Sequence, residues 1–122
     1  MTDMAGYRID RISEDIKREI VAVMRELKDP RVQGNLLTVV KVEVSSDASF
    51  AKVFVSSMSG IDDAKQAVKG LDAATGFIRR EVGKRLHLRK TPELKFVADN
   101  SIEYGMSIAK MLDDLKEDEN AD

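Results

Sequence analysis

Residues 64–86 read AKQAVKGLDAATGFIRREVGKRL, which is two helical runs joined through Ala74-Thr75-Gly76. Apolar residues recur at spacings of three and four in each run, a pattern typical of helices that bury one face. Glycine is common where a helix bends or breaks, because it tolerates backbone conformations that other residues avoid. We therefore predict two helices that meet at Ala74-Thr75-Gly76, with Gly76 setting the angle between them.

Outside this pair of helices, apolar residues recur at every second position, which is the period of β-strands. Val40 to Val44 alternate apolar with polar residues, and a second alternating run covers residues 51–55 after the turn Ser46-Asp47-Ala48-Ser49. We predict a β-hairpin here and a third strand over Leu94 to Ala98. Phe54 lies on the polar side of the second strand, where it either stacks on a base or packs under a helix or at the sheet edge.

Two further helices are expected near the ends of the chain. Ile9 to Leu27 carry an apolar stripe at helical spacing that must end before Pro30, and a last stripe runs from Ile102 to Leu115. The order predicts one α+β domain over residues 1–116, with helices covering one face of a three-stranded sheet. Residues 117–122 are expected to be a disordered acidic tail.

Charge is distributed unevenly along the 122 residues. The net charge is −2, yet residues 1–112 carry +3 because the end of the chain is acidic. Between residues 79 and 90 there are six basic side chains against one acidic one: Arg79, Arg80, Lys84, Arg85, Arg89 and Lys90. A local cationic patch on a mildly acidic chain predicts an anionic partner.

The residue types argue against several classes of protein. The chain has no cysteine and a single histidine, His87, so we expect no disulfide, no metal site and no cofactor. No phosphate-binding loop, dinucleotide fingerprint or nucleophile elbow occurs, and we predict that the protein is not an enzyme. No secretory signal or membrane-spanning stretch is visible, which predicts a cytoplasmic protein that does not bind membranes.

The strongest functional signal is the set of basic residues that follows Ala74-Thr75-Gly76. The backbone N–H groups at a helix N-terminus attract phosphate, and neighbouring arginines add bidentate contacts. The alternative is an ordinary solvated helix face. We predict an RNA-backbone site formed by those six residues, together with Arg11 and Arg18 on the outward face of the first helix.

The order helix–strand–strand–helix–joint–helix–strand resembles a type II KH domain. The usual Gly-x-x-Gly loop is missing, and Ala74-Thr75-Gly76 stands in its place. The whole chain resembles the ribosome-binding factor A family, whose KH-like domain has an Ala-x-Gly helical kink. The resemblance covers roughly residues 7–112 and rests on these segments: Arg8 to Arg11, Lys28-Asp29-Pro30-Arg31, Val42 to Asp47, Ala51 to Ser56, Ala74 to Arg79, Leu86 to Leu94, and Asp99-Asn100-Ser101 followed by Gly105.

This resemblance implies a monomeric, non-enzymatic assembly factor that binds free small ribosomal subunits. It implies contact with small-subunit ribosomal RNA near its 5′-terminal helix, and a role in late maturation and processing of that RNA. Cold adaptation and interplay with assembly GTPases are family traits. Three alternatives stay open: another KH-like RNA-binding protein, a protein-interaction module that uses the basic face, and a nuclease or RNA-modifying enzyme.

Overall fold

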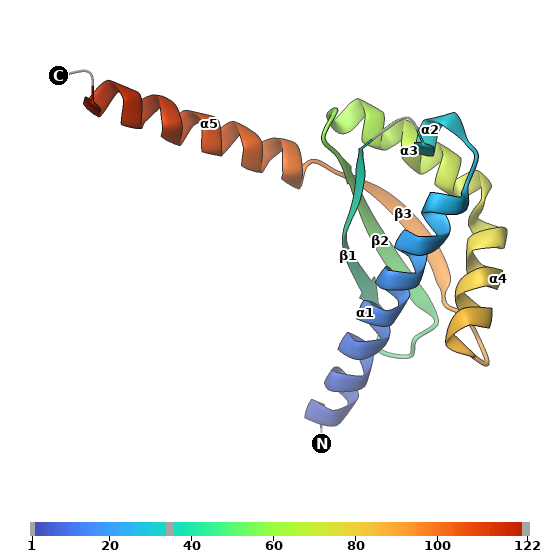
Figure 1. Ribbon diagram of the computed structural model, residues 1–122. Helices are drawn as coiled ribbons and strands as arrows, with labels where there is room; N and C mark the ends of the chain where they lie inside the picture. The colour runs from blue at the N-terminus through green and yellow to red at the C-terminus, as the bar shows by residue number, and fades with distance from the viewer. Residues whose placement is uncertain (1, 34–35, 121–122) are drawn as a thin grey trace.

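The computed structural model describes residues 2–33 and 36–120. Its elements follow in the order α1 (Thr2–Glu26), α2 (Pro30–Gln33), β1 (Leu37–Val44), β2 (Phe50–Ser57), α3 (Ile61–Ala73), α4 (Thr75–Leu86), β3 (Glu93–Asp99) and α5 (Ser101–Asn120). This is the predicted α+β order (Figure 1). The hairpin, the broken helix pair, the third strand and the last helix all lie where the sequence predicts them.

The three strands form one sheet in the order β1-β2-β3. β1 and β2 are antiparallel, with an irregularity in register between Val39 and Lys41, and β3 runs parallel to β2. At the hairpin turn, the carboxylate of Asp47 accepts hydrogen bonds from both flanking serines, Ser45 and Ser49. Because β1 lies at an edge of the sheet, one side of this strand is open to further packing.

The core lies between one face of the sheet and the helices α1, α3 and α4, which cover that face (Figure 1). Alternate strand residues point into it, among them Val53, Val55 and Phe96, and they meet Ile20 of α1 and Ile78 of α4. Burying this many aliphatic side chains supplies most of the stability that a domain of this size can have. The polar residues that alternate with these apolar ones along the strands lie on the opposite face of the sheet.

α2 is an element that the sequence did not predict. α1 ends at Glu26, three residues before the expected stop at Asp29. The Asp29 carboxylate then accepts a hydrogen bond from the Arg31 backbone N–H at 2.9 Å and pairs with the Arg31 guanidinium at 2.7 Å. These contacts hold the first turn of a helix that is only four residues long, which is too short to show a periodic apolar pattern.

α5 projects away from the compact part of the molecule (Figure 1). Its chief contact is with β2, and its side chains from Tyr104 to Lys116 are exposed. The helix continues to Asn120, so the disorder expected from residue 117 is wrong for residues 117–120, while residues 121 and 122 lie outside the described part of the chain. Residues 106–120 contain neither glycine nor proline, so helix propensity alone can extend the helix without packing.

The described helices were compared with the requirements of a membrane-spanning helix. None of them combines the length and the apolar composition that crossing a bilayer requires.

Candidate nucleic-acid interface

The joint between α3 and α4 is a single residue, Ala74, with φ −99° and ψ 9°. Its N–H donates to the carbonyl oxygens of Gly70 and Leu71 at 3.2 and 3.1 Å, and its own carbonyl accepts from the Ile78 N–H at 2.9 Å. The Thr75 hydroxyl donates to the Leu71 carbonyl at 3.1 Å. The break therefore lies within the predicted Ala74-Thr75-Gly76 motif.

Gly76 does not set the angle of this joint, contrary to the expectation from the sequence. It is the second residue of α4, and among the described glycines only Gly60 has a positive φ. A Cβ at position 76 would meet nothing within 4 Å. The backbone of Ala74 lies in a region that any L-amino acid can adopt, so the bend requires no glycine.

Arg79, one of the predicted RNA ligands, is used inside the fold. Its Nη2 donates to the Thr91 carbonyl oxygen at 2.8 Å and its Nε donates to the Pro92 carbonyl oxygen at 3.1 Å. These two bonds tie α4 to the segment that leads into β3. The guanidinium is therefore committed to the protein backbone and is poorly placed to receive a phosphate.

Arg85 is also committed to the fold. Its Nη2 donates to Glu26 Oε1 at 2.7 Å, and its guanidinium lies 3.5 Å from Glu81 Oε2 and 3.9 Å from Glu19 Oε2. The hydrogen bond to Glu26 is the main reason that the pKa of Arg85 is raised, and the charges of Glu26, Glu81 and Glu19 add to it. Three carboxylates already neutralise this side chain, so it offers little net charge to RNA.

The other four predicted residues of this region are exposed: Arg80 and Lys84 on α4, and Arg89 and Lys90 in the connection to β3. No ion pair or side-chain hydrogen bond is formed by any of them within residues 2–33 and 36–120. They are the cations of the predicted set that are available to an anionic ligand.

On α1 the two predicted residues differ from each other. Arg18 is 66% exposed but lies 3.3 Å from Asp15 Oδ1 and 3.7 Å from Glu19 Oε1. Glu19 therefore lies between the guanidiniums of Arg18 and Arg85, which links the outer face of α1 to α4. Arg11 is exposed and has no such pair in the part of the chain that the structure describes.

Three further exposed residues of α3 and α4 were not among the predicted RNA ligands. Phe77 is the third residue of α4 and is 37% exposed, which is unusual for an aromatic side chain on a packed helix. Lys65 and Lys69 are exposed on α3. The signal for them was available, because Lys65 and Lys69 are four residues apart, as are Arg80 and Lys84, and this spacing repeats on one helix face.

His87 has a structural role at the end of α4. It adopts the left-handed conformation, with φ 53° and ψ 42°. The Leu88 N–H donates to the Gly83 carbonyl at 2.9 Å across it, which is the hydrogen-bond pattern of a Schellman cap. In the part of the chain that is described, His, Asp and Glu side chains form no cluster that could hold a metal ion.

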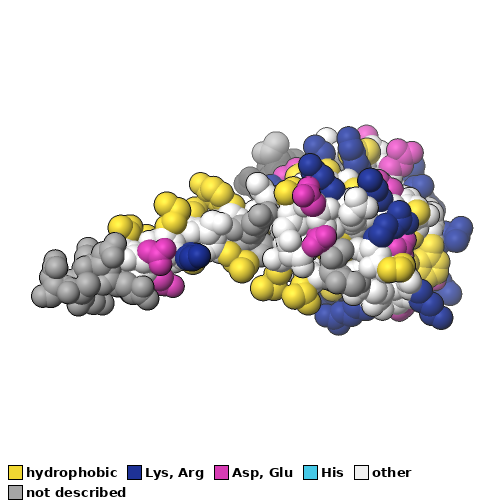
Figure 2. All heavy atoms as spheres, turned by 90° about the horizontal axis from the view of Figure 1, so that it is seen from above, with side chains coloured by type: hydrophobic (Ala, Val, Ile, Leu, Met, Phe, Trp, Pro, Cys, Tyr) yellow, Lys and Arg dark blue, Asp and Glu magenta, His cyan; other side chains and the backbone are white. Residues whose placement is uncertain are grey.

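Phe77, Arg80 and Lys84 are spaced by three and four residues and so share one face of α4, and Arg89 and Lys90 follow the end of that helix; we call Arg80, Lys84, Arg89 and Lys90 the cationic surface. The N-terminus of α4 has no side-chain cap, so no side chain competes with a ligand for its first backbone N–H groups beside Phe77. Figure 2 shows that Lys and Arg side chains gather over the compact part of the molecule, whereas α5 carries apolar ones. Such a surface can bind a phosphodiester backbone through charge and hydrogen bonds.

Comparison with known proteins gives a consistent result. The family model for ribosome-binding factor A matches residues 8–112. A protein of Clostridium tetani named ribosome-binding factor A is 45% identical over 98% of this chain and 98% of its own length.

Solved structures agree with the sequence comparison. The crystal structure of ribosome-binding factor A from Thermus thermophilus is 27% identical, with a TM-score of 0.66, over 74% of this chain and 93% of that one. A homology model of the Thermus thermophilus ribosome binding factor A, fitted into the cryo-EM map of its 30S complex, is 26% identical, with a TM-score of 0.61, over 73% of this chain and 92% of that one.

Proposed function

The chain belongs to the ribosome-binding factor A family, and from this premise we propose that it is a non-enzymatic assembly factor of the small ribosomal subunit. It binds free small subunits through their ribosomal RNA and acts on them as a monomer in the cytoplasm. The family name and the fitted 30S complex of the Thermus thermophilus protein support binding to the subunit.

One observation carries the proposal at the level of residues. The cationic surface is exposed and unpaired in the described structure, while Arg79 and Arg85 of the same basic stretch are held by protein groups. On a helix face that is only solvated, there is no reason for two arginines to bind protein groups while the neighbouring cations stay unpaired. Here Arg79 and Arg85 fix α4 against its neighbours, while Arg80 and Lys84 on the same helix, and Arg89 and Lys90 directly after it, are exposed to solvent.

The chemistry of this surface favours a nucleic-acid backbone. Arg80 can form bidentate contacts with phosphate oxygens, and Lys84 adds a point charge one turn further along α4. Phe77 lies one turn before Arg80 and offers a flat apolar surface to a base. We therefore place the ribosomal RNA along α4, with the cations on phosphates and the ring beside the bases.

The finer role follows the expectations for the family. We propose that the contacted RNA is the region of the 5′-terminal helix, that binding occurs late in maturation, and that it assists processing of the precursor. Cold adaptation and a functional interplay with assembly GTPases belong to the same proposal. The protein contributes binding energy to one RNA conformation and makes or breaks no covalent bond.

Co-sedimentation with purified ribosomal particles tests the proposal. The protein should pellet with free small subunits and neither with large subunits nor with assembled ribosomes. The variant Arg80→Glu/Lys84→Glu should no longer bind. The matched control is Lys41→Glu/Lys95→Glu, an equal change of charge at exposed strand positions, which should bind like the parent. Equal weakening in both variants would mean that general charge, not this surface, is responsible.

Two rival functions give different results in companion assays. If the basic surface docks on an acidic protein, binding to ribosomal particles should survive digestion of their RNA. If the protein is a nuclease, the pure protein with a divalent cation should shorten precursor RNA, and replacing a single carboxylate should abolish that cleavage. We expect neither result.

A further inference from the structure

The start of the edge strand β1 lacks the features that usually protect the edge of a sheet. Residues 36–40 contain no charged residue and no proline, and the Leu36 side chain is 65% exposed. Further along the strand, Lys41 and Glu43 are exposed and form an ion pair, beyond an irregularity in register that follows Val39. Charges and bulges hinder the addition of another strand. Only residues 36–40, which we call the open edge, are free of both.

Backbone groups of the open edge are left without partners by the pairing of β1 with β2. The Met58 N–H donates to the Leu36 carbonyl oxygen at 3.1 Å, which makes these two residues a hydrogen-bonded pair of the antiparallel ladder. Such pairs alternate with pairs whose N–H and C=O groups point away from the partner strand. Leu37 and Val39 occupy these outward positions in the same register. Within residues 2–33 and 36–120, no loop or side chain hydrogen-bonds to their backbone groups.

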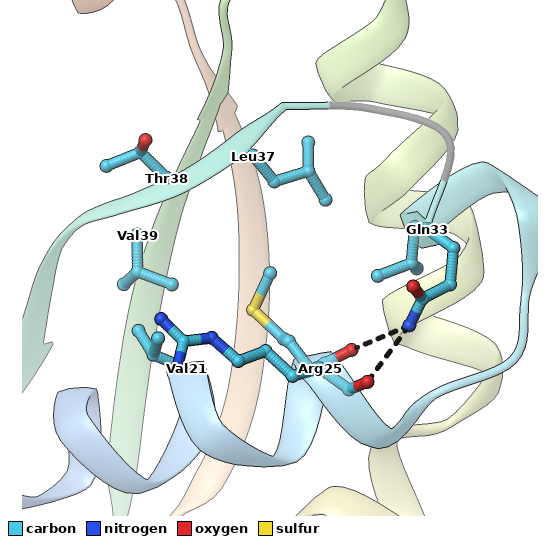
Figure 3. Close-up of a pocket in the computed structure, with 8 residues that line it drawn as sticks. Val21, Arg25, Gln33, Leu37, Thr38 and Val39 are labelled. Atoms are coloured by element: carbon cyan, nitrogen blue, oxygen red, sulfur yellow. Dashed lines mark hydrogen bonds between the residues drawn. The ribbon is translucent and has the colours of Figure 1, made fainter.

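The same two residues line a groove between β1 and the end of α1. The groove is a pocket of about 360 Å³, and we call it the β1 groove. Leu37 and Val39 lie on one side of it, and Val21 and Met24 of α1 lie on the other. Figure 3 shows β1 passing along one side of this groove and α1 along the other. A strand added to the open edge would direct one row of its side chains into this apolar groove.

The end of the β1 groove toward α2 is held by hydrogen bonds. The side-chain amide of Gln33 donates to the carbonyl oxygens of Met24 and Arg25 at 3.5 and 3.2 Å (Figure 3). These bonds tie α2 to the last turn of α1. The groove is therefore formed before any ligand arrives, which lowers the free-energy cost of binding.

The hydrogen-bonding pattern of the open edge decides which kind of partner fits. The N–H and C=O groups of Leu37 and Val39 need acceptors and donors in alternation, at the spacing of a β-strand. Phosphate oxygens accept hydrogen bonds but donate none, and an α-helix already uses its own backbone groups. We propose that the open edge binds an extended segment of another protein, which adds a fourth strand to the sheet and places apolar side chains in the β1 groove.

This site is separate from the cationic surface. Arg79 ties α4 to the segment that leads into β3, and β3 lies at the opposite edge of the sheet from β1 (Figure 1). The protein can therefore hold RNA and an extended segment at the same time. The inference stands on the sheet edge alone and does not depend on the proposed function.

Binding of labelled peptides to the full chain tests the proposal. The probes are short capped peptides in which glutamate alternates with valine, leucine or phenylalanine, and binding is measured by fluorescence anisotropy. The parent protein should bind at least one of them. A parent that binds none at concentrations up to about 1 mM would overturn the proposal. A parent that is dimeric without peptide would also overturn it, because a second copy would then occupy the open edge.

Methylation of peptide nitrogens separates backbone pairing from unspecific apolar binding. Two isomers of the bound peptide carry N-methyl groups either on the apolar residues or on the glutamates. Successive N–H groups of a strand point to opposite sides, so only one isomer loses the donors that face β1. That isomer should bind at least about tenfold more weakly than the other, because several hydrogen bonds are lost. Equal affinities would overturn the proposal.

Variants of the protein locate the peptide. Leu37→Pro removes one outward N–H at the first residue of β1, where a strand tolerates proline, and should weaken binding several-fold. Val21→Phe fills the β1 groove from α1 without touching the β1 backbone, and should weaken binding as well. The matched control Arg80→Glu/Lys84→Glu changes only the cationic surface and should bind the peptide like the parent. If Val21→Phe, shown to be folded by its thermal unfolding, binds like the parent, the peptide lies elsewhere and the proposal fails.

Amide hydrogen exchange gives the most direct result. The bound peptide should slow exchange of the Leu37 and Val39 N–H groups, which point to the free edge in the protein alone. The Thr38 N–H, which points to β2 in the same ladder, is the internal control and should change little. A bound peptide that leaves Leu37 and Val39 exchanging as fast as before would overturn the proposal.

Discussion

Arg85 Nη2 lies 2.7 Å from Glu26 Oε1, although 59 residues separate the two in sequence. The contact joins the middle of the chain to the last turn of α1, and Glu19 and Glu81 surround the same guanidinium. It fixes the position of α4 relative to α1. Arg80 and Lys84, the part of the cationic surface that lies on α4, are thus oriented by an ion-pair network in which the charge of Arg85 is already neutralised within the protein.

We expect Arg85→Ala to lower the midpoint of thermal unfolding, because three carboxylates would be deprived of the cation that they share. Arg80→Ala removes the same charge from the same helix without removing a protein partner, and should leave the midpoint nearly unchanged. For RNA binding, measured on fully folded protein, we expect the reverse: Arg80→Ala should lose more affinity than Arg85→Ala. If both variants melt like the parent, the network makes no net contribution to stability, as is common for exposed ion pairs.

Two glycines on the broken helix pair should respond to alanine in opposite directions. A Cβ at Gly70 would lie 3.0 Å from Val32 Cγ2 and 3.1 Å from Asp29 Oδ2, and Asp29 is held in place by Arg31. We expect Gly70→Ala to destabilise the protein by about 1–2 kcal/mol through overpacking, measured by urea unfolding.

Gly76→Ala is the comparison for that variant. It places a methyl group in open space within a helix, so it should stabilise the protein by up to about 1 kcal/mol. We also expect weaker RNA binding, because the methyl group would keep an RNA backbone from approaching the start of α4. A stabilised variant that binds RNA as well as the parent would remove the start of α4 from the interface.

His87→Gly should stabilise the protein by about 1 kcal/mol. His87 has φ 53°. This left-handed conformation destabilises a residue that has a Cβ by about 1 kcal/mol, whereas glycine adopts it at almost no cost in free energy. The Schellman cap around it needs only backbone groups. Lys84→Gly changes a residue three positions earlier, in regular helix. It should destabilise the protein by a similar amount. A decrease of stability in His87→Gly would show that the imidazole makes a contact of its own.

Asp47 should contribute to stability in a window of acid pH. Hydrogen bonds from the Ser49 hydroxyl, the Ser45 hydroxyl and the Ser49 N–H lower the pKa of Asp47 to about 2 from its ordinary value of 3.8. A carboxyl whose folded-state pKa is depressed stabilises the fold above its unfolded-state pKa, and this contribution disappears as pH falls through the folded-state pKa. The decline should therefore occur between about pH 4 and pH 2.

The check is the pH dependence of urea unfolding for the parent and Asp47→Asn. The difference between the two should be constant above about pH 5 and should shrink as the pH falls toward about 2. A difference that does not change with pH would mean that the carboxylate is not ionised in these hydrogen bonds.

Local patterns in the sequence predict most of the fold. The alternation around Val42 and Val53 and the helical spacing around Leu71 and Val82 each describe one buried face, and the structure confirms them. α2 was missed because its start depends on one side chain, that of Asp29, and not on a repeat. The apolar stripe from Ile102 to Leu115 predicted the helix α5, but an apolar repeat does not show what, if anything, covers it.

The candidate site could be predicted only as a region. Charge alone marks residues 79–90, yet it cannot distinguish Arg79, which binds two carbonyl oxygens, from its exposed neighbour Arg80. The partners of Arg79 lie 12 and 13 residues further along the chain, and two of the three carboxylates around Arg85 belong to α1, so only the fold brings these groups together. Phe54 illustrates the same limit: it lies on the central strand β2 with Lys41 Nζ 4.7 Å from its ring centre, rather than under a helix.

The salt dependence of RNA binding tests the central claim most directly. We would measure the affinity for a small-subunit ribosomal RNA fragment at a series of salt concentrations, for the parent, for Arg80→Glu/Lys84→Glu/Lys90→Glu and for the sheet control Lys41→Glu/Lys95→Glu. The slope of log affinity against log salt should become shallower by roughly one for each phosphate that a variant no longer binds. We predict a clearly flatter slope and weaker binding for the triple variant of the cationic surface and a parental slope for the control. A triple variant that keeps the parental slope while remaining folded would contradict the assignment of the cationic surface to RNA.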